Sequence, residues 1–510
     1  MRFFLATAQK VIVLVVFLPA KLAKTPPENI NFFCISPKHT MRNRKTGALS
    51  DRSVLCCSKK RGCAMRIGLD FGTTNSSAAV YDGKRVHLLA LDPEHTSPTV
   101  MRSTLFISRE GALSIGRQAI NRFTEGNVGR EIEYQWRYIG DTEVTFADFG
   151  TVMQSLYVPV DANTPGRLFQ SLKSHLRDRS FRGTDVFGVR YTIETLIAVV
   201  LRMIVERIES QTKEKVTEMV IGRPVHYSVD QSLDALALER MHNAGKEAGL
   251  PPFRFLFEPT AAALAYASQA RSEQHVLVFD FGGGTLDVTI MKLDGRGGRE
   301  VLATDGVPIG GDLMDRRLVM GKVLHHFGAG AQLGPRRLAF PAVILEHLSE
   351  WQSIVELTQP RYQNIIEEAI RTGDKPRELQ QLRVLVRENY GLPLYEEVER
   401  AKVRLSENKQ TMISMHVPGI TMDELVERWD FERMIGPDVR AVAACVDRAL
   451  ESAGLLAEDV DVVLRTGGSS RIPAYVRMLS EKFGAERLQE MDVFTGVASG
   501  LAIAAHEVRD

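Results

Sequence analysis

Two short stretches of the chain combine a carboxylate, glycines and hydroxyl side chains in the same order. One runs from Asp70 to Thr74 with the sequence DFGTT, and the other from Asp280 to Thr285 with the sequence DFGGGT. A glycine turn lets a ligand approach the backbone, and free N–H groups in such a concavity bind phosphate. A carboxylate beside each turn suits Mg²⁺, which takes oxygen ligands and is commonly bound together with phosphates. The residue types therefore predict chemistry on a nucleoside triphosphate.

The two stretches occupy equivalent places in an internal repeat. Each follows a largely apolar run, Ile67–Leu69 in the first copy and Val276–Phe279 in the second. The two aspartates are 280 − 70 = 210 residues apart. A single turn of this kind fits an ordinary surface hairpin equally well, but two matching copies argue against that interpretation. The repeat predicts two related lobes whose hairpins face each other across a cleft.

Composition and charge narrow the class of protein. The 510 residues are 44% hydrophobic and 25% charged, which is ordinary for a soluble globular protein with a large core. Residues 1–64 hold twelve Lys/Arg and two Asp/Glu, a net charge of +10, whereas the remaining 446 residues hold 52 and 61, a net charge of −9. An acidic body argues against nucleic acid as a partner.

The first 64 residues differ from the body in cysteine content as well. They hold four of the five cysteines, and the body holds only Cys445, which fits a reducing compartment and predicts a cytoplasmic protein. The apolar run Val11–Ala20 is too short to span a bilayer, and we expect no membrane partner. Residues 1–64 read as a targeting segment or as mistranslated upstream sequence. The discontinuity in charge and cysteine content predicts that the active protein begins near Met65.

Several motifs resemble the seventy-kilodalton heat-shock chaperone (Hsp70, DnaK-like) family. The Asp70 and Asp280 stretches resemble its two phosphate hairpins, and Glu258–Tyr266, EPTAAALAY, matches a family nonapeptide almost letter for letter. Gly467–Pro473, GGSSRIP, resembles its Gly-Gly-Ser-x-Arg-Ile-Pro loop, and the resemblance covers residues 66–508 in order. It implies an α/β, two-lobed actin-like ATPase fold, a duplicated ribonuclease H-like architecture with the nucleotide in the interlobe cleft.

The resemblance also implies a domain plan. Residues 65–270 form lobe I, 271–460 form lobe II, and 461–510 are a closing segment that returns to lobe I. The interval from Asp315 to Glu399 is longer than in the family, so we expect a helical insertion at about 316–398 that enlarges the lid over the nucleotide. Residues 125–165 are irregular and read as another insertion. Because the resemblance stops where the family's ATPase domain stops, we expect no β-rich peptide-binding domain, as in short DnaK-like proteins of bacteria.

Catalytic and metal-binding roles follow from the residue types and from the resemblance. Asp70 and Asp280 would hold Mg²⁺ through its waters, and the resemblance implies that Asp287 helps to bind a monovalent cation such as K⁺. Glu258 follows an apolar strand and would orient the attacking water. The remaining expected catalytic residues are Thr285 and Lys173, both facing the γ-phosphate, with Lys173 on a helix over 168–176.

A larger set of residues would bind the phosphates, ribose and base of ATP or ADP. It comprises Gly72, Thr73, Thr74, Asn75, Gly282, Gly283, Gly284, Gly310, Gly311, Glu399, Lys402, Ser406, Gly467, Gly468, Ser469, Arg471 and Ile472. Three positions depart from the family pattern. Lys173 matches only loosely, Val403 replaces an adenine-stacking arginine, and Phe494 replaces an aspartate, with Asp492 nearby. These departures put base preference and hydrolysis rate in doubt.

The sequence thus predicts a chaperone-type protein that binds ATP and hydrolyses it slowly with Mg²⁺. Its expected partners are the nucleotide and a client protein or co-chaperone that contacts the ATPase domain. The altered base-contacting residues keep a non-catalytic, nucleotide-responsive binding module as an alternative. A small-molecule kinase of the same superfamily is a further alternative, although no sugar-kinase signature is present.

Overall fold

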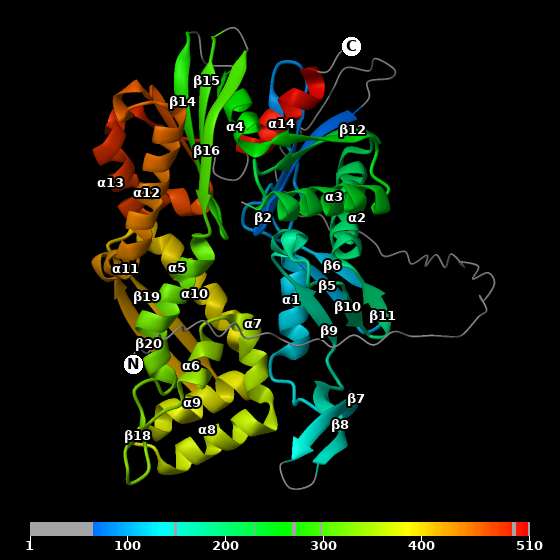
Figure 1. The fold of residues 1–510 in the computed structure, drawn as a ribbon, viewed down its shortest axis with the longest axis vertical. Helices are drawn as coiled ribbons and strands as arrows, with labels where there is room; N and C mark the ends of the chain where they lie inside the picture. Colours follow the sequence, from blue (N-terminus) through cyan, green and yellow to red (C-terminus); the bar gives the residue numbers. More distant parts are fainter. Residues whose placement is uncertain are drawn as a thin grey trace, which may run out of the picture. The chain divides into compact units, whose positions relative to one another are not determined.

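The computed structural model describes residues 65–146, 150–228, 230–267, 272–295, 298–491 and 496–507 (Figure 1). The expectations for residues 1–64 and for Asp492 and Phe494 therefore lie outside the described residues. Within the described part, no helix combines the length and the apolar character needed to cross a membrane.

The first lobe is built on a sheet in which β1 (Met65–Phe71) is central. It pairs in parallel with β12 (Val216–Arg223) and antiparallel with β2 (Asn75–Tyr81). Alternate β1 side chains pack into a core with the helices α2 and α3, because successive residues of a strand point to opposite faces. The remaining elements of this layer are β13 (Phe253–Phe257), β3 (Val86–Leu88), β4 (Met101–Arg102), α2 (Ile193–Thr212) and α3 (Gln231–Glu247).

The second lobe repeats this arrangement around β14 (Gln274–Phe281). That strand pairs antiparallel with β15 (Leu286–Leu293) and in parallel with β21 (Val462–Thr466). Each lobe therefore has a central strand with a hairpin partner on one side and a parallel strand on the other. The flanking elements are β16 (Arg299–Val307), β22 (Leu488–Glu490), α12 (Gly436–Ala453) and α13 (Pro473–Phe483).

The expected return of residues 461–510 to the first lobe is wrong for most of that segment. The fully buried strand β21 extends the second sheet, and β22 pairs with it in parallel, so residues 462–490 belong to the second lobe. Helix α14 (Gly496–Glu507) does lie on the first sheet, where it contacts β1, β2 and β12. An apolar strand can join either sheet, and the local sequence does not distinguish the two edges.

The two sheets are joined through α14 and α4 (Glu258–Ala267), which lie between them (Figure 1). Alanines of both helices share a core with Val220 of the first sheet and Val276 of the second. The backbones approach closely, since a Cβ at Gly500 would lie 1.7 Å from the Ala261 carbonyl oxygen. The run of small residues in the nonapeptide is therefore a requirement of packing.

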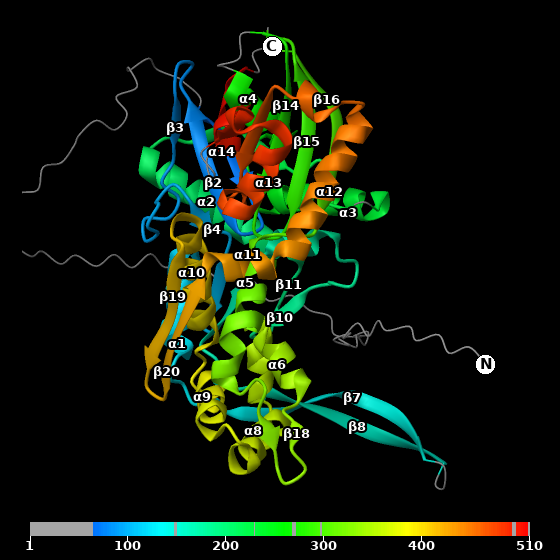
Figure 2. The ribbon, with the colours of Figure 1, turned by 90° about the vertical axis from the view of Figure 1, so that its left-hand side faces the viewer.

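A smaller subdomain of the first lobe carries a long β-hairpin. The subdomain sheet pairs β5 (Leu105–Ser108) with β6 (Leu113–Ile115) and β9 (Gly166–Phe169), next to α1 (Arg117–Asn127). The hairpin comprises β7 (Tyr134–Phe146) and β8 (Gly150–Asp161) and reaches away from its neighbours (Figure 2). It occupies the interval 125–165, for which the sequence pattern predicted no regular structure.

The helix expected over 168–176 is wrong in its first part. Leu168 and Phe169 end strand β9, and only Leu172–Arg177 is helical, as the 3-10 helix η1. A short hairpin of β10 (Thr184–Val186) and β11 (Val189–Tyr191) leads on to α2. The apolar residues at 168, 169, 172 and 176 fitted a helical period. Residues 168 and 169 are nevertheless in a strand, because Phe169 pairs with Leu105 on β5.

The segment between strand β16 and helix α12 is mainly helical. The insertion expected at about 316–398 has the expected helical character, although α6 and α7 are short, with a break at Ser349 and Glu350 between them. The elements are α5 (Gly311–Leu318), η2 (Val319–Val323), η3 (Leu324–Phe327), β17 (Gln332–Leu333), β18 (Leu338–Ala339), α6 (Ala342–Leu348), α7 (Trp351–Ile354), η4 (Val355–Thr358), α8 (Pro360–Thr372), α9 (Pro376–Arg387), α10 (Gly391–Glu407), β19 (Gln410–Val417), β20 (Ile420–Glu427) and α11 (Arg428–Met434).

Candidate active site

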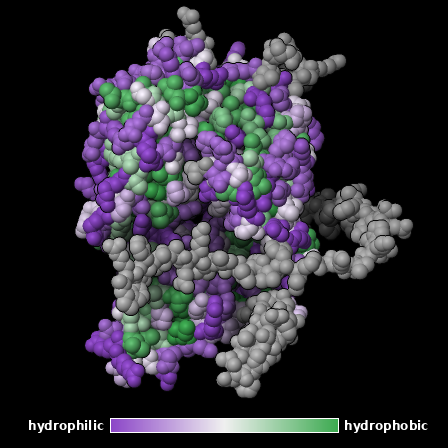
Figure 3. Space-filling model, viewed as in Figure 1, coloured by the Kyte–Doolittle hydropathy of each residue, from purple (hydrophilic) through white to green (hydrophobic). Residues whose placement is uncertain are grey.

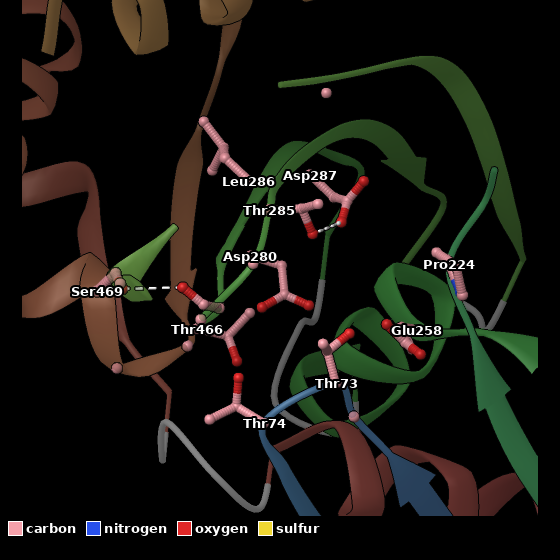
Figure 4. Close-up of a pocket in the computed structure, with 18 of the residues that line it drawn as sticks. Thr73, Thr74, Pro224, Glu258, Asp280, Thr285, Leu286, Asp287, Thr466 and Ser469 are labelled. Carbon is pink, nitrogen blue, oxygen red and sulfur yellow. Dashed lines mark hydrogen bonds between the residues drawn. The ribbon is translucent and has the colours of Figure 1, made fainter. Parts of the chain in front are cut away.

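The two glycine turns have the same backbone geometry and face each other. The Gly72 N–H donates to the Asn75 carbonyl oxygen at 3.1 Å, and the Gly282 N–H donates to that of Thr285 at the same distance. A Cβ at Gly283 would lie 2.1 Å from Thr74 Oγ1, so the tip of one hairpin directly opposes the tip of the other. Figure 4 shows Thr73 and Thr74 across the site from Asp280 and Thr285. The sequence repeat had predicted this opposition.

A cavity of about 620 Å³ lies where the turns meet. Figure 3 shows hydrophilic and hydrophobic residues interspersed over one face of the molecule, with a hollow between the two lobes. Most of the predicted binding residues line the cavity: Asp70, Gly72, Thr73, Thr74, Asn75, Lys173, Glu258, Asp280, Gly282, Gly283, Gly284, Thr285, Asp287, Gly311, Glu399, Lys402, Ser406, Gly467, Gly468, Ser469 and Ile472.

Two predicted residues lie just outside this lining. Gly310 packs behind the second turn, where a Cβ would be 2.1 Å from the Gly283 carbonyl oxygen. The Arg471 guanidinium forms an ion pair with Glu490, and 49% of its side chain is exposed. Gly310 therefore supports the turn from behind, and Arg471 is directed to the edge of the sheet.

Four carboxylates and one ammonium converge in the cavity. Lys173 Nζ donates to Glu258 Oε1 at 2.6 Å, and Asp70, Asp280 and Asp287 line the same cavity. Figure 4 shows Glu258, Asp280 and Asp287 around the site. Burial, and then the charge of Glu258, raises the pKa of Asp70 to about 7 and that of Asp287 to about 6. The same two causes hold the pKa of Asp280 well above its usual range. Such a group of half-buried acids is well suited to a bound cation.

Lys173 reaches this cluster from the short helix η1. Ser171 at its N-terminal end is left-handed, with φ of 53°, and Leu172 and Leu176 are buried in the first-lobe core. The lysine side chain is only 8% exposed. Although burial lowers the pKa of Lys173, the neighbouring Glu258 raises it above its usual value. Packing of η1 thus places a charged ammonium beside Glu258.

Tyr227 is a site residue that sequence reasoning missed. Its hydroxyl is buried and has no hydrogen-bond partner among the described residues, and burial raises its pKa to about 12. It lies near Lys173 and Glu258, three residues after Pro224, which ends strand β12. Thr74 Oγ1 is likewise buried without a partner. No local sequence pattern marks Tyr227 as a site residue.

Helix α10 forms the wall on which the base and ribose were expected. Lys402 Nζ donates to Asp315 Oδ2 at 2.7 Å and to the Gly311 carbonyl oxygen at 3.1 Å. Glu399 forms an ion pair with Arg102, a second residue that the sequence did not single out. Val403 lines the cavity with its side chain exposed. The charged side chains of this wall, Glu399 and Lys402, are therefore paired with neighbouring residues, whereas the wall is apolar at Val403.

The loop after β21 closes the cavity on the second-lobe side. Ser469 Oγ donates to the Gly282 carbonyl oxygen at 2.9 Å, which ties this loop to the second turn (Figure 4). Gly467 is left-handed, with φ of 79°, and a Cβ there would lie 2.2 Å from the Phe281 carbonyl oxygen. Glycine is needed at this position because both the conformation and the space exclude a side chain.

Comparison with known proteins identifies the family. The family model described as "Hsp70 protein" matches residues 66–332 and 383–509. The interval 333–382, which lies inside the predicted 316–398 insertion, is outside the match.

Curated relatives agree with this match. The chain is 30% identical to the chaperone protein DnaK of Thermus thermophilus over 463 residues, covering 88% of this chain and 62% of that protein. It is 30% identical to the chaperone protein dnaK of Cyanidioschyzon merolae, covering 86% of this chain and 61% of the other. It is 31% identical to the heat shock 70 kDa protein BIP3 of Oryza sativa, covering 87% and 56%. The chain thus spans about six-tenths of the length of these relatives, and it belongs to the Hsp70 family, whose actin-like ATPase fold it shares.

Proposed function

We propose that this protein binds ATP and ADP with Mg²⁺ in the cavity and hydrolyses ATP slowly, as a chaperone-type member of its family. The observation that carries the proposal is the Lys173–Glu258 pair beside three half-buried aspartates, at the point where two glycine turns meet. Anion donors, carboxylates for a metal and one ammonium are the parts that phosphoryl transfer to water requires.

The donor set fits a hydrated divalent cation together with phosphate. Asp70 and Asp280 would hold Mg²⁺, and Asp287 would contribute to a K⁺ site. Mg²⁺, when bound, neutralises charge on the phosphate oxygens. Thr74 Oγ1 and the Tyr227 hydroxyl, both buried without partners, are polar atoms that a bound phosphate or its water would satisfy. Their unpaired state supports a ligand in this position.

Backbone and side-chain groups of the cavity have distinct roles in the proposed hydrolysis. Backbone N–H groups of the turns at Gly72 and Gly283 orient the phosphates, and Thr285 lies at the second turn. Glu258 orients the attacking water, and the Lys173 ammonium stabilises charge that develops on the transferring phosphoryl group. Because these two groups already bond to each other at 2.6 Å, each partly offsets the other. We therefore expect slow turnover.

The proposal also covers the protein partners and the cellular compartment. Hsp70 relatives are chaperones, so we propose that client proteins or co-chaperones contact the helical segment 316–398. The chain covers only part of the length of its relatives, and this surface is the expected site of contact within the described residues. Cys445 is buried as a free thiol, which is consistent with a reducing compartment such as the cytoplasm.

The test is nucleotide binding and single-turnover hydrolysis by the full chain. We expect ADP and ATP to bind more tightly with Mg²⁺ than with a chelator, and Glu258→Gln to abolish most hydrolysis while retaining binding. Glu218→Gln, which alters a first-lobe surface pair with Arg66, serves as the matched control.

Other outcomes would contradict particular parts of the proposal. Binding without hydrolysis in the wild type would support a nucleotide-responsive module, an alternative that the exposed Val403 and the Arg102–Glu399 pair favour. ADP release that depends on an added sugar would indicate a kinase. Absence of nucleotide binding would overturn the assignment of the cavity.

A further inference from the structure

Two adjacent histidines and a glutamate converge on the second lobe, away from the nucleotide cavity. His326 Nε2 lies 3.0 Å from Glu424 Oε2, and His325 Nε2 lies 3.4 Å from the same oxygen. One ligand atom from each residue falls within 4.8 Å of the other two. None of the three residues lines the nucleotide cavity. The two imidazoles and the carboxylate therefore form a separate cluster.

The spacing agrees with ligands of one metal ion. Two atoms bound to Zn²⁺ at about 2.0–2.1 Å in a tetrahedral arrangement lie about 3.3–3.4 Å apart. The two measured nitrogen–oxygen separations, 3.0 and 3.4 Å, bracket this value. Adjacent residues of a helix normally point in different directions, but here the two imidazole centroids are 4.0 Å apart. The two rings are thus directed to the same carboxylate.

The elements that carry the three ligands are tied together by a buried amide. Gln381 on α9 donates from Nε2 to the His326 carbonyl oxygen at 3.0 Å and accepts at Oε1 from the Thr421 N–H at 2.8 Å. It therefore joins η3, which carries the histidines, to β20, which carries Glu424. Gly328 ends η3 in the left-handed region, with φ of 89°, where a Cβ would lie 2.6 Å from Leu379. The ligand backbone is held in place without a metal.

Glu424 Oε2 is hydrogen-bonded to His326 Nε2, and the nearby lysines bond mainly to other groups. Lys322 Nζ is 3.9 Å from Glu424 Oε1 and 2.6 Å from Asp430 Oδ2, so its charge is offset mainly by Asp430. Lys375 directs its ammonium to the Ala329 carbonyl oxygen at 2.9 Å. Glu424 Oε2 faces the two histidines. The side chain of Glu424 is 16% exposed and that of His325 52%, so the cluster is open to solvent on one side.

We propose that His325, His326 and Glu424 form a binding site for a first-row divalent transition metal, with Zn²⁺ as the expected ion. Two imidazoles and one carboxylate are ligands that Zn²⁺, Co²⁺ and Ni²⁺ accept, whereas Mg²⁺ and Ca²⁺ prefer oxygen alone. Three protein ligands with an open side leave room for water or for a fourth ligand from another molecule. The bound ion would link η3 to β20 within the second lobe, independently of the nucleotide.

Zn²⁺ titration of the full chain tests this site. The protein is freed of metal and nucleotide, and the cysteines of residues 1–64 are first alkylated because thiolates bind Zn²⁺ themselves. Affinity is measured against a chromophoric chelator, and thermal unfolding is followed with and without Zn²⁺. We expect one equivalent to bind and to raise the unfolding temperature. We also expect His326→Ala and Glu424→Gln each to weaken binding by about tenfold or more.

His416→Ala is the matched control, since His416 pairs with Asp423 at 2.9 Å on the same β-hairpin but lacks a second histidine. It should bind Zn²⁺ like the wild type. The unfolding temperature of each variant without metal establishes that the variant folds. Glu424→Gln changes the side chain least, so it keeps the test valid if a histidine variant fails to fold. Equal Zn²⁺ affinity in the wild type and in the His325→Ala/His326→Ala double variant, or no stoichiometric binding at all, would overturn the proposal.

Discussion

Arg102 on strand β4 of the first lobe forms an ion pair with Glu399 on helix α10 of the second, and Glu399 lines the nucleotide cavity. Burial alone would raise the pKa of Glu399, but Arg102 and Lys402 together lower it, so the carboxylate is charged. The lobes also meet farther along, where the Gly129 N–H donates to the Glu388 carbonyl oxygen at 3.1 Å. The pair is therefore one of several contacts that hold the lobes closed over the cavity.

Removing Arg102 should speed the release of nucleotide. Arg102→Ala leaves Glu399 charged without its partner across the cleft and weakens closure. We expect ADP to dissociate about fivefold faster, since a partly exposed ion pair contributes on the order of 1 kcal/mol. Stopped-flow displacement of a fluorescent ADP measures the rate. Arg400→Ala on the same helix is the control because Arg400 pairs with Glu397 within α10, and its rate should not change. Equal rates in all three proteins would contradict the prediction.

Removing Lys173 should impair hydrolysis much more than binding. Loss of one preorganised donor to a transition state typically costs about 10²–10³ in rate. Mg²⁺ and the glycine turns remain in Lys173→Ala, so nucleotide affinity should change little. Single-turnover hydrolysis and calorimetric ADP affinity provide the two readouts, with Lys215→Ala, an 85% exposed lysine, as control. An unchanged hydrolysis rate in Lys173→Ala would refute the role assigned to this lysine.

Replacing Val403 with arginine should strengthen binding of adenine nucleotides. Val403 lines the cavity with 58% of its surface exposed, at the position where the family resemblance implies a stacking arginine. A guanidinium over an aromatic base contributes about 0.5–1 kcal/mol, or about two- to fivefold in affinity. ADP affinity and tripolyphosphate affinity are compared, because only ADP has a base. Leu425→Arg adds the same charge at an exposed position of β20. Equal gains for both ligands would indicate charge attraction without stacking.

Asp70 makes the stability of the nucleotide-free protein depend on pH. Burial and Glu258 raise its pKa from 3.8 to about 7. Protonation therefore favours the fold: this stabilisation is complete below about pH 4 and is lost as the pH rises through 7. Asp70→Asn stays uncharged, so its free energy of unfolding should fall less between pH 5 and pH 8 and exceed the wild-type value at pH 8 by ~2–4 kcal/mol.

Urea unfolding without Mg²⁺ or nucleotide measures this difference at each pH. Glu300→Gln changes an exposed carboxyl on β16 and should leave the wild-type pH profile unaltered. Parallel profiles for Asp70→Asn and the wild type would show that the carboxyl is not held in its protonated form.

Adding one methyl group at Gly500 should destabilise the protein. The new Cβ would lie 1.7 Å from the Ala261 carbonyl oxygen, and a backbone atom cannot move aside as a flexible side chain can. We expect Gly500→Ala to lower the free energy of unfolding by ~2–3 kcal/mol. Glu507→Ala, at the exposed last residue of the same helix, should change it by less than ~0.5 kcal/mol. A wild-type unfolding midpoint for Gly500→Ala would be inconsistent with the packing described.

Local chemistry explains which parts of the site were predictable. The turns at Asp70 and Asp280 were recognised because carboxylate, glycine and hydroxyl residues are adjacent in the chain. Lys173 was correctly expected in the cavity, but the helix expected over 168–176 is present only from Leu172, because Phe169 ends a strand. Its burial comes from packing of η1, which a helical period does not reveal.

Long-range pairing explains what was missed. Arg102 and Glu399 are 297 residues apart, and no spacing rule connects them. Tyr227 faces Lys173 and Glu258 only because the chain turns back after Pro224. Strand β21 was assigned to the wrong lobe because an apolar strand carries no mark of the sheet that it joins. In each case the deciding partner is distant in sequence.

The contact between α4 and α14 has a mechanical consequence. At Ala261 and Gly500 the two helices touch backbone to backbone, with no large side chains interlocked between them. Interlocked side chains permit only discrete arrangements, whereas smooth surfaces slide over each other by small amounts. We therefore expect the lobes to rotate by shear about this contact. The close contact between α4 and α14 would then also be the axis of this rotation.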